Sequence, residues 1–289
     1  MSKCVKIAGN FIGEGYPCFV IAEVGINHNG SLSMAKGLID IAVATGCDAV
    51  KFQKRTIDVV YTKEELARER NSIFGKTNGD LKRGLEFGYE EYKEIDKYCK
   101  ERNIIWFASC WDEASVDFME QFDTPCYKIA SASLTDDNLL KHTRSKGKPI
   151  LLSTGMSTME EIRHAVDILG KEDLIIYHCT STYPSNTDEI NLGAIKTLYE
   201  EFGCPVGYSG HERGIMPSVL AVAQGAVSVE RHITTDRTNW GSDHAASLEI
   251  AGLSHMIRDI RQVPILLGDG CKKVYEREIP IIEKLRRVK

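Results

Sequence analysis

Two lysines interrupt short apolar runs in this sequence. Lys51 lies within Ala49-Val-Lys-Phe-Gln53, and Lys128 lies within Cys126-Tyr-Lys-Ile-Ala130. A charge inside an apolar strand is costly to bury unless it is paired. We therefore expect each ammonium group to point into a polar cavity, toward an anion or a carboxylate. A structural ion pair with Glu23 is the alternative.

Two histidines close later apolar runs. His211 follows one run and His232 ends the next. If these runs are neighbouring parallel strands, roughly 4.8 Å apart, the two imidazoles can reach one divalent metal. Glu230 and Asp243 lie nearby in the sequence and favour this interpretation. Two protein ligands leave positions for water or a substrate oxygen, as Lewis-acid catalysis requires. A hydrogen-bonded structural role is the alternative for each histidine.

The combined charges predict the kind of ligand. Two lysines, a metal and several hydroxyl groups favour a compact anion such as a phosphate or a carboxylate. Gln53, Tyr183 and Asp243 can pair with the hydroxyl groups of a polyol. The pattern therefore predicts one anionic and one sugar-like substrate. Because 36 Lys and Arg residues stand against 41 Asp and Glu residues, for a net charge of -5, nucleic acid is not expected as a partner.

Eight short β-branched runs must position these residues. Stretches with helical spacing lie between successive runs; one of them, residues 33–45, is closed by Gly46, and another covers residues 158–169. Such alternation specifies a parallel sheet covered on its faces, and eight units in about 240 residues fit a (β/α)8 TIM barrel. An open sheet is the rival, but no glycine-rich phosphate loop follows the first run. The runs cover residues 19–24, 49–53, 104–109, 126–130, 149–153, 174–179, 205–209 and 226–232.

Polar residues close nearly every run. Active sites of such barrels form at the C-terminal ends of the strands, so we expect these residues to converge at one mouth. For a single Ser or Thr, a helix cap or a turn is the alternative. In strand order the candidates are Glu23 and Asn27; Lys51 and Gln53; Ser109; Lys128, Ser131 and Ser133; Ser153 and Thr154; His178, Ser181 and Tyr183; Ser209 and His211; and Glu230 and His232.

Two segments depart from the regular alternation. Residues 1–17 contain Gly13, Gly15 and Pro17 and are predicted to form a short N-terminal β-hairpin at the bottom of the barrel. The connection over residues 54–88 is far longer than a usual βα loop. We interpret it as a substrate lid, with a disordered surface insertion as the alternative.

The remaining composition predicts a single cytoplasmic domain. No linker-like change of composition divides residues 1–289, so the whole chain is expected to form one barrel domain. The N-terminal residues lack a secretory signal, and no apolar run approaches the roughly 18 residues of a membrane span. The nine cysteines form no CxxC pair and are expected to be buried free thiols.

A series of motifs occurs in order along essentially the whole chain. They are Ala22-Glu-Val-Gly-Ile-Asn-His-Asn-Gly30, Val50-Lys-Phe-Gln53, Lys128-Ile-Ala-Ser131, Ser153-Thr-Gly-Met156, Ser181-Thr-Tyr-Pro184, Gly207-Tyr-Ser-Gly-His211, Glu230-Arg-His232 and Ser242-Asp-His-Ala-Ala-Ser-Leu248. Together they resemble the sialic acid synthase family. One motif alone would be a weak signal, but the ordered set is specific.

The resemblance implies a transferase of carbohydrate biosynthesis. Such a metal-dependent barrel condenses phosphoenolpyruvate with an aldose, N-acetylmannosamine or a related amino sugar, to give a nine-carbon 2-keto acid and phosphate. Its metal is commonly Mn2+, with Mg2+ or Co2+ as alternatives. The resemblance places the metal on His211 and His232, the sugar near Gln53, Tyr183 and Asp243, and proton handling on Glu23. Around phosphoenolpyruvate it places Lys51, Lys128, Ser131, Ser153, Ser181 and Ser209. Ser109 and Glu230 at strand ends and Asn71 in the long connection are further substrate-binding candidates from the sequence itself.

The chain also departs from the family pattern. Family members usually continue into a small antifreeze-like domain, which supplies an arginine to the sugar site of the partner subunit. This sequence stops at Leu285-Arg-Arg-Val-Lys289, so either the protein lacks that domain or the sequence is part of a longer one. A domain-swapped homo-oligomer and the identity of the sugar therefore stay open. Candidates from the sequence to replace that arginine are Arg68, Arg70, Asn71 and Arg83.

Three further positions concern the family pattern and the loop over the sugar. Arg231 stands where the family commonly has a lysine, which keeps the positive charge but changes its geometry. Arg237 and Trp240 fit a lid over the sugar, with loop packing as the alternative. A synthase for a phosphorylated aldose, of the eight-carbon sugar-acid type, and a non-catalytic sugar-binding barrel remain as alternative functions.

Overall fold

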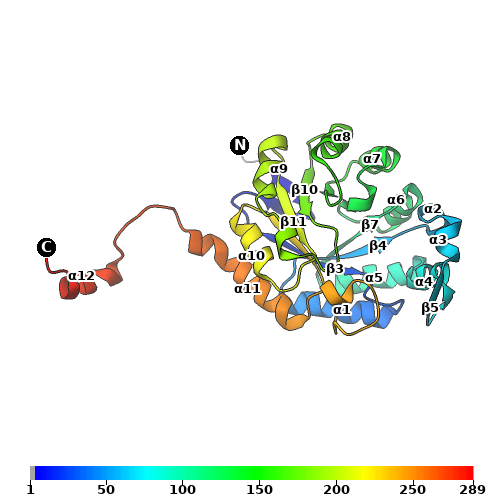
Figure 1. Cartoon of the computed structure of the whole chain (residues 1–289), viewed down its shortest axis with the longest axis horizontal. Coiled ribbons are helices and arrows are strands. Elements are labelled where there is room, and N and C mark those ends of the chain that lie inside the picture. The colour runs from blue at the N-terminus through cyan, green and yellow to red at the C-terminus, as the bar shows by residue number, and fades with distance from the viewer. Residues whose placement is uncertain (1–3, 289) are drawn as a thin grey trace.

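Eight parallel strands close into a barrel, and helices surround it (Figure 1). This computed structural model describes residues 4–288. The predicted (β/α)8 TIM barrel is confirmed, and each predicted run coincides with one strand. Around the barrel the order is β3 (Phe19–Gly25), β4 (Ala49–Lys54), β7 (Ile105–Cys110), β8 (Tyr127–Ile129), β9 (Ile150–Ser153), β10 (Leu174–Cys179), β11 (Val206–Gly210) and β12 (Ser228–His232), which pairs with β3 again.

The outer helices begin and end where the sequence provides caps. Ser31 accepts a hydrogen bond from the backbone of Met34 at the start of α1 (Leu32–Thr45), and Gly46 ends this helix with a φ of 84°. Thr158 forms a capping box with Glu161 at the start of α8 (Met159–Leu169). The other barrel helices are α5 (Tyr89–Glu101), α6 (Glu113–Met119), α7 (Asp137–Arg144), α9 (Ala194–Phe202), α10 (Met216–Ala223) and α11 (Ile250–Leu267). Short 3-10 turns lie at Glu120–Phe122, Ser131–Ser133, Thr187–Glu189, His244–Ala246 and Glu276–Glu278.

The predicted N-terminal hairpin is confirmed. Strands β1 (Cys4–Ile7) and β2 (Asn10–Gly13) pair antiparallel, and residues 1–3 lie outside the described part of the chain. Val5, Ile7 and Ile12 of the hairpin pack in one cluster with the inward-facing residues at the lower ends of the barrel strands. The hairpin thus closes the bottom of the barrel with apolar side chains.

The long connection between β4 and α5 is an ordered subdomain. The alternative of a disordered insertion is therefore wrong. Glycines allow its close packing, because a Cβ on Gly30 or Gly84 would overlap the Phe74 ring. Phe74 thereby anchors the insertion to the loop after β3. Its elements are α2 (Ile57–Val60), α3 (Lys63–Ala67), β5 (Glu69–Ser72), β6 (Gly75–Thr77) and α4 (Asn78–Leu85).

Beyond α11 the chain extends away from the barrel and ends in α12 (Ile279–Leu285) (Figure 1). Within residues 4–288, no helix combines the length and the apolarity that crossing a membrane requires. All nine cysteines are free thiols, as expected. Cys4 and Cys271 are exposed, however, so the expectation of burial is wrong for these two.

Candidate active site

The side chains that face into the barrel change character along each strand. Because alternate residues of a strand face the same side, residues two positions apart share the interior. On β3, Ile21 and Glu23 therefore both face the interior, with Glu23 nearer the mouth. On β4, Ala49 and Lys51 are related in the same way. The same step leads from Phe107 to Ser109, Cys126 to Lys128, and Leu151 to Ser153. The upper half of the interior is therefore polar.

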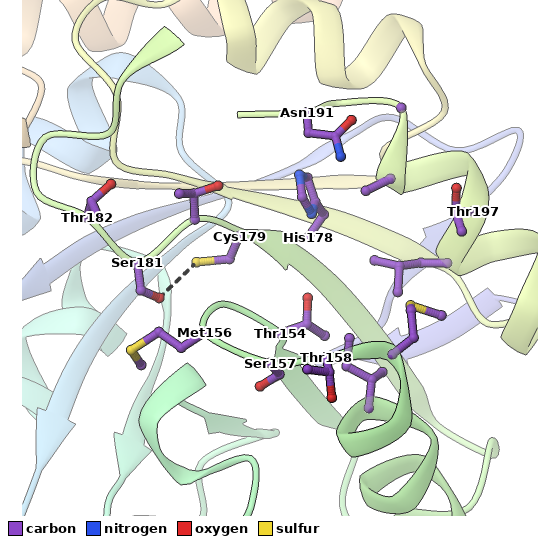
Figure 2. Close-up of a pocket in the computed structure, with 16 residues that line it drawn as sticks. Thr154, Met156, Ser157, Thr158, His178, Cys179, Ser181, Thr182, Asn191 and Thr197 are labelled. Carbon is purple, nitrogen blue, oxygen red and sulfur yellow. Dashed lines mark hydrogen bonds between the residues drawn. The ribbon is translucent and has the colours of Figure 1, made fainter. Parts of the chain in front are cut away.

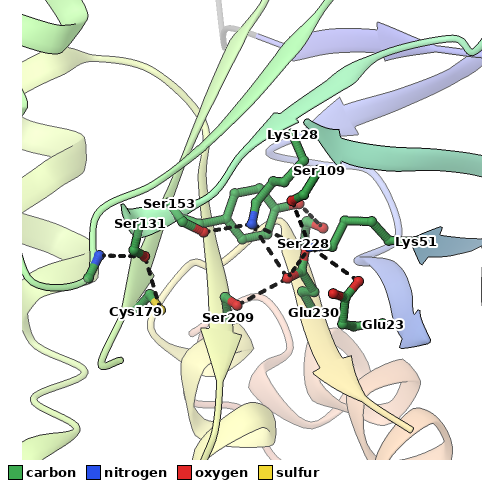
Figure 3. A network of polar contacts seen from close by, with 12 residues as sticks. Glu23, Lys51, Ser109, Lys128, Ser131, Ser153, Cys179, Ser209, Ser228 and Glu230 are labelled. Carbon is green, nitrogen blue, oxygen red and sulfur yellow. Dashed lines mark hydrogen bonds and ion pairs between the residues drawn. The ribbon is translucent and has the colours of Figure 1, made fainter. Parts of the chain in front are cut away.

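Lys51 lies at the centre of a buried ion network (Figure 3). Its Nζ atom is 3.2 Å from Oε2 of Glu23 and 3.1 Å from Oε1 of Glu230, and it donates to Ser109 Oγ at 3.2 Å. Lys128 Nζ donates to Ser153 Oγ at 2.6 Å and lies 3.4 Å from Glu230. The alternative of an ion pair with Glu23 is thus confirmed for Lys51. This pair lies in the predicted cavity, so the two interpretations are not exclusive.

The two carboxylates of the network have opposite pKa shifts. Burial raises the pKa of Glu23 to about 7, and the neighbouring Glu230 adds to this rise, while Lys51 opposes it. Burial would also raise the pKa of Glu230, but Lys128 and Lys51 outweigh it and hold this pKa at about 2. Such separation of two nearby acids is what acid–base chemistry at neutral pH requires. Glu23 can exchange a proton near pH 7, whereas Glu230 stays ionised between two ammonium groups.

His211 and His232 come together at the ends of β11 and β12, with ring centroids 5.5 Å apart. His211 Nδ1 is 2.8 Å from the carbonyl oxygen of Thr180, so this nitrogen donates. Burial would lower the pKa of His211, but the neighbouring Cys179 outweighs it and raises this pKa above its ordinary value. His232 Nδ1 is buried without a hydrogen-bond partner and lies 3.8 Å from Asp243 Oδ2. Burial lowers the pKa of His232 to about 3, so the ring is neutral.

Two imidazoles with ring centroids 5.5 Å apart fit a divalent cation, which binds the deprotonated ring nitrogen and completes its shell with water or substrate oxygen. Within residues 4–288, no three His, Cys, Asp or Glu side chains are arranged to hold a metal by themselves. A cation at His211 and His232 would therefore have open coordination positions.

A central cavity of about 200 Å3 gathers nearly all the predicted site residues. Two are not among its lining residues. Asp243 stands behind His232, and Asn71 lies in a neighbouring groove. The predicted residues that line the cavity are Glu23, Lys51, Gln53, Ser109, Lys128, Ser131, Ser153, Ser181, Tyr183, Ser209, His211, Glu230 and His232.

Besides two alanines, Ala130 and Ala132, sequence reasoning missed three larger residues of the central cavity, Trp111, Met156 and Cys179. A search for polar residues at strand ends passes over all three. Trp111 directly follows β7, and its indole nitrogen is buried without a partner. Cys179 is the last residue of β10 and shares the inward face with Tyr177, so the alternation of that strand could have found it.

Four residues expected at the mouth do not line the central cavity, so this expectation is wrong for Asn27, Ser133, Thr154 and His178. Ser133 instead lines a separate cavity next to α2. The Asn27 amide donates to the carbonyl of Ile233, and Thr154 Oγ1 donates to the carbonyl of Tyr177. His178 points to the outside of the barrel, where its Nε2 lies 2.7 Å from the carbonyl of Ile190. Neighbours on a strand face opposite sides, and His178 precedes the inward Cys179.

His178 lines an outer cavity of about 920 Å3 between the loops after β9 and β10 (Figure 2). This outer cavity shares Met156, Cys179 and Ser181 with the central cavity. Its wall is rich in hydroxyl groups and has no Lys, Arg, Asp or Glu. It therefore suits an uncharged polar ligand or water better than an anion.

A third cavity of about 660 Å3, the insertion groove, lies between the 54–88 insertion and the loop after β12. Trp240 lines it and makes an edge contact with Phe74, with ring centroids 6.1 Å apart. Arg237 is exposed and donates to the carbonyl of Ala245. The groove is lined by Ile26, Asn29, Arg70, Asn71, Ser72, Ile73, Leu81, Lys82, Leu85, Trp240, Gly241 and Ser242.

Arg231 does not reach the central cavity. It lies between two inward-facing residues of β12, so its side chain points outward, where it is fully buried. The guanidinium donates to Oε1 of Glu212 at 2.7 Å, to the carbonyl of Glu212 at 2.6 Å and to that of Gly214 at 2.9 Å. Glu212 and Arg231 are the chain neighbours of His211 and His232, so this ion pair ties together the strand ends that carry both imidazoles.

Comparison with known proteins agrees with this geometry. The model of the NeuB family matches residues 38–272. Human N-acetylneuraminate-9-phosphate synthase is 39% identical over 282 residues, which is 96% of this chain and 79% of the human protein. The N,N'-diacetyllegionaminic acid synthase of Legionella pneumophila is 36% identical over 285 residues, which is 95% of this chain and 80% of that protein.

Solved structures show the same architecture. The N-acetylneuraminic acid synthetase of Leptospira borgpetersenii serovar Hardjo-bovis, solved with citrate, matches with a TM-score of 0.86 and 31% identity over 100% of this chain and 99% of that chain. A truncated 3-deoxy-D-arabino-heptulosonate 7-phosphate synthase of Thermotoga maritima shares the fold alone, with a TM-score of 0.71 and 14% identity over 92% of this chain and 93% of that chain. The resemblance drawn from the motifs is thus confirmed, and this chain belongs to the NeuB family of phosphoenolpyruvate-dependent nonulosonic acid synthases.

Proposed function

We propose that this protein condenses phosphoenolpyruvate with an aldose related to N-acetylmannosamine, and releases phosphate and a nonulosonic acid. One observation carries the proposal: two buried ammonium groups and two imidazoles face the same closed-bottom cavity. The ammonium groups suit a small substrate with two anionic ends, and the imidazoles suit a cation that binds an oxygen of the second substrate.

Phosphoenolpyruvate binds against the lysines in this proposal. Lys51 and Lys128 contact its phosphate and carboxylate and stabilise the charge that shifts between them during the reaction. Without substrate both ammonium groups pair with Glu230, which keeps them from being buried alone. The hydroxyl groups that surround this position and can donate to the phosphate belong to Ser109, Ser131, Ser153, Ser181 and Ser209.

The aldose binds on the histidine side, where Gln53, Tyr183 and Asp243 can pair with its hydroxyl groups. A divalent cation held by His211 and His232, most commonly Mn2+ with Mg2+ or Co2+ as alternatives, would polarise the aldehyde oxygen of the open-chain sugar. The C3 atom of phosphoenolpyruvate forms the new bond to the aldehyde carbon. Water then adds to C2, and the tetrahedral intermediate expels phosphate as the C2–O bond breaks.

Glu23 is the proposed general base for the water. Its carboxylate lies 3.2 Å from Lys51 Nζ, and the Gln53 amide donates to it at 2.8 Å, so it stands between the two substrate positions. A pKa of about 7 allows it to take a proton at neutral pH.

A coupled phosphate-release assay tests the proposal. The protein is freed of metal with a chelator, supplied with Mn2+ and phosphoenolpyruvate, and given N-acetylmannosamine, N-acetylmannosamine 6-phosphate or arabinose 5-phosphate. We expect phosphate release with a mannosamine substrate and a nine-carbon product by mass spectrometry. Turnover of arabinose 5-phosphate alone would instead establish the eight-carbon synthase. Sugar binding without phosphate release would establish the non-catalytic barrel.

A further inference from the structure

We infer that the insertion groove holds the far end of the aldose, and that Arg70 and Lys82 there select an aldose that carries a phosphate ester. This inference rests on the proposed function and narrows its substrate class.

The first argument is size. The central cavity has about 200 Å3, whereas pockets for small ligands typically have roughly 300–1,000 Å3. Two substrates must meet there, so the larger of them has to extend into a neighbouring space. The insertion groove offers about 660 Å3.

The second argument is continuity with the reaction centre. A Cβ on Gly25 would lie 3.1 Å from Glu23 Oε1 and 3.3 Å from His232 Cε1, so this backbone forms part of the cavity rim. The next residue, Ile26, lines the insertion groove. On the opposite side, Ser242 lines the groove and donates to Asp243, whose other oxygen lies 3.8 Å from His232 Nδ1. The insertion groove therefore borders the histidine side of the central cavity, through the chain neighbours of Gly25 and Asp243, although the two cavities share no lining residue.

The third argument is charge. Arg70 and Lys82 line the groove, and within residues 4–288 no carboxylate lies within ion-pair distance of either. Arg70 makes only a long hydrogen bond of 3.4 Å to Asn78 Oδ1, and Lys82 Nζ lies 5.0 Å from the centroid of the Tyr61 ring.

The neighbouring arginines differ in this respect. Arg68 pairs with Glu65 and Arg83 with Asp58, and neither lines the groove. The groove wall contains no Asp or Glu, so the charges of Arg70 and Lys82 are available to a ligand. A guanidinium and an ammonium group on the wall of one groove suit a dianionic phosphate ester. The face of Trp240 adds an apolar surface for the carbon chain of the sugar.

The outer cavity is the rival position for the far end of the sugar. It is larger and shares Met156, Cys179 and Ser181 with the central cavity, but its wall offers hydroxyl and amide groups without a cationic side chain (Figure 2). It would favour a neutral sugar. The two cavities therefore predict opposite substrate preferences.

The test compares two acceptors in the complete chain. We expect the wild-type protein to have a higher kcat/KM for N-acetylmannosamine 6-phosphate than for N-acetylmannosamine. In the double variant Arg70→Met/Lys82→Met, kcat/KM for the phosphorylated sugar should fall about 10- to 100-fold, mainly through KM, because contacts to the unreactive end bind ground and transition states alike. The kcat/KM for the neutral sugar should fall far less, because that sugar has no phosphate for the two cations to bind, and the KM for phosphoenolpyruvate should stay unchanged.

Lys76→Met is the matched control, since Lys76 is an exposed lysine of the same hairpin that does not line the groove. Thermal unfolding followed by circular dichroism verifies that the variants fold. A wild-type preference for the neutral sugar, or an equal loss with both sugars in the double variant, would overturn the inference and leave the proposed function standing. Absence of phosphate release with every aldose would instead refute the proposed function.

Discussion

The two ends of the barrel are built from the same strands but are governed by different physical demands. At the bottom, Ile21 and Phe107 pack against Ile12 of the hairpin without a polar partner. Two residues further along the same strands, Glu23 and Ser109 belong to a network of charges and hydroxyl groups. Apolar burial stabilises the bottom, whereas burial of charge at the mouth costs stability unless every charge is paired. The bottom therefore supports the fold and the mouth supports the chemistry.

The largest effect on the mouth should come from Glu23→Gln, which removes the proposed base and keeps the shape. We expect turnover to fall about 100- to 10,000-fold. In the wild type, kcat/KM should rise with pH up to about 7 and then level off, because Glu23 of the free enzyme becomes basic only when it loses its proton at that pKa. The variant should lose this limb. A pH–rate profile of both proteins checks this, and an unchanged limb in the variant would assign it to another group.

The raised pKa of Glu23 also makes the stability of the protein depend on pH, and Glu23→Gln should weaken this dependence. The native state binds a proton at Glu23 with a pKa of about 7, above the ordinary value of 4.5. The unfolded state therefore binds fewer protons between these values, and the free energy of unfolding falls as pH rises from 4.5 to about 7. Urea unfolding at several pH values should show this decline in the wild type and a smaller decline in the variant.

Lys128→Met should lower kcat/KM for phosphoenolpyruvate about 100- to 1,000-fold, because one buried donor to the anion is lost. Glu230 keeps Lys51 as its partner, so the fold should persist. Steady-state kinetics measure the effect, and Lys97→Met on the exposed face of α5 is the control. Wild-type kinetics in the Lys128 variant would remove this residue from the site.

His232→Ala should weaken Mn2+ binding at least about 10- to 100-fold, since a direct ligand matters more than the groups that orient ligands. Isothermal titration calorimetry measures the Mn2+ affinity directly and does not depend on catalytic activity. His164, an exposed histidine paired with Asp137, supplies the control substitution His164→Ala. Equal affinity in the two variants would place the metal elsewhere.

The smallest effect on catalysis should come from the bottom. Ile12→Ala opens a cavity among fully buried side chains and should cost about 2–5 kcal/mol of stability. The kcat and KM of the folded fraction should not change, because Ile12 lies at the end of the barrel opposite the mouth network. Phe11→Ala, at a neighbouring exposed position, is the control for unfolding by urea. A loss of kcat per folded molecule would show that the two ends are coupled.

The sequence predicts the barrel well because its periodicity is local. The run predicted over 174–179 is identical to the observed β10, and the alternation that buries Ile175 also turns Cys179 inward. The lysines and histidines of the mouth could be predicted because a charge or an imidazole at the end of an apolar strand is costly to bury without a partner or a ligand.

Other features depend on contacts between distant segments. Phe74 packs against the backbone of Gly30 and Gly84, and no local sequence pattern predicts that contact. Trp111 was missed because an indole after a strand is typical of a packed core as much as of a site. The environment of Arg231 depends on Glu212, which lies on another strand end.

The hairpin under the barrel also has a kinetic consequence. Because the central cavity is closed at its bottom, substrates enter it from the mouth. The substrate that binds deepest must therefore bind first, and the product derived from it must leave last, unless a second opening forms. Lys51 and Lys128 are almost inaccessible to solvent, whereas Tyr183 on the sugar side is 45% exposed. Initial-rate and product-inhibition patterns should therefore show an ordered mechanism, in which the anionic substrate binds first and the sugar binds second.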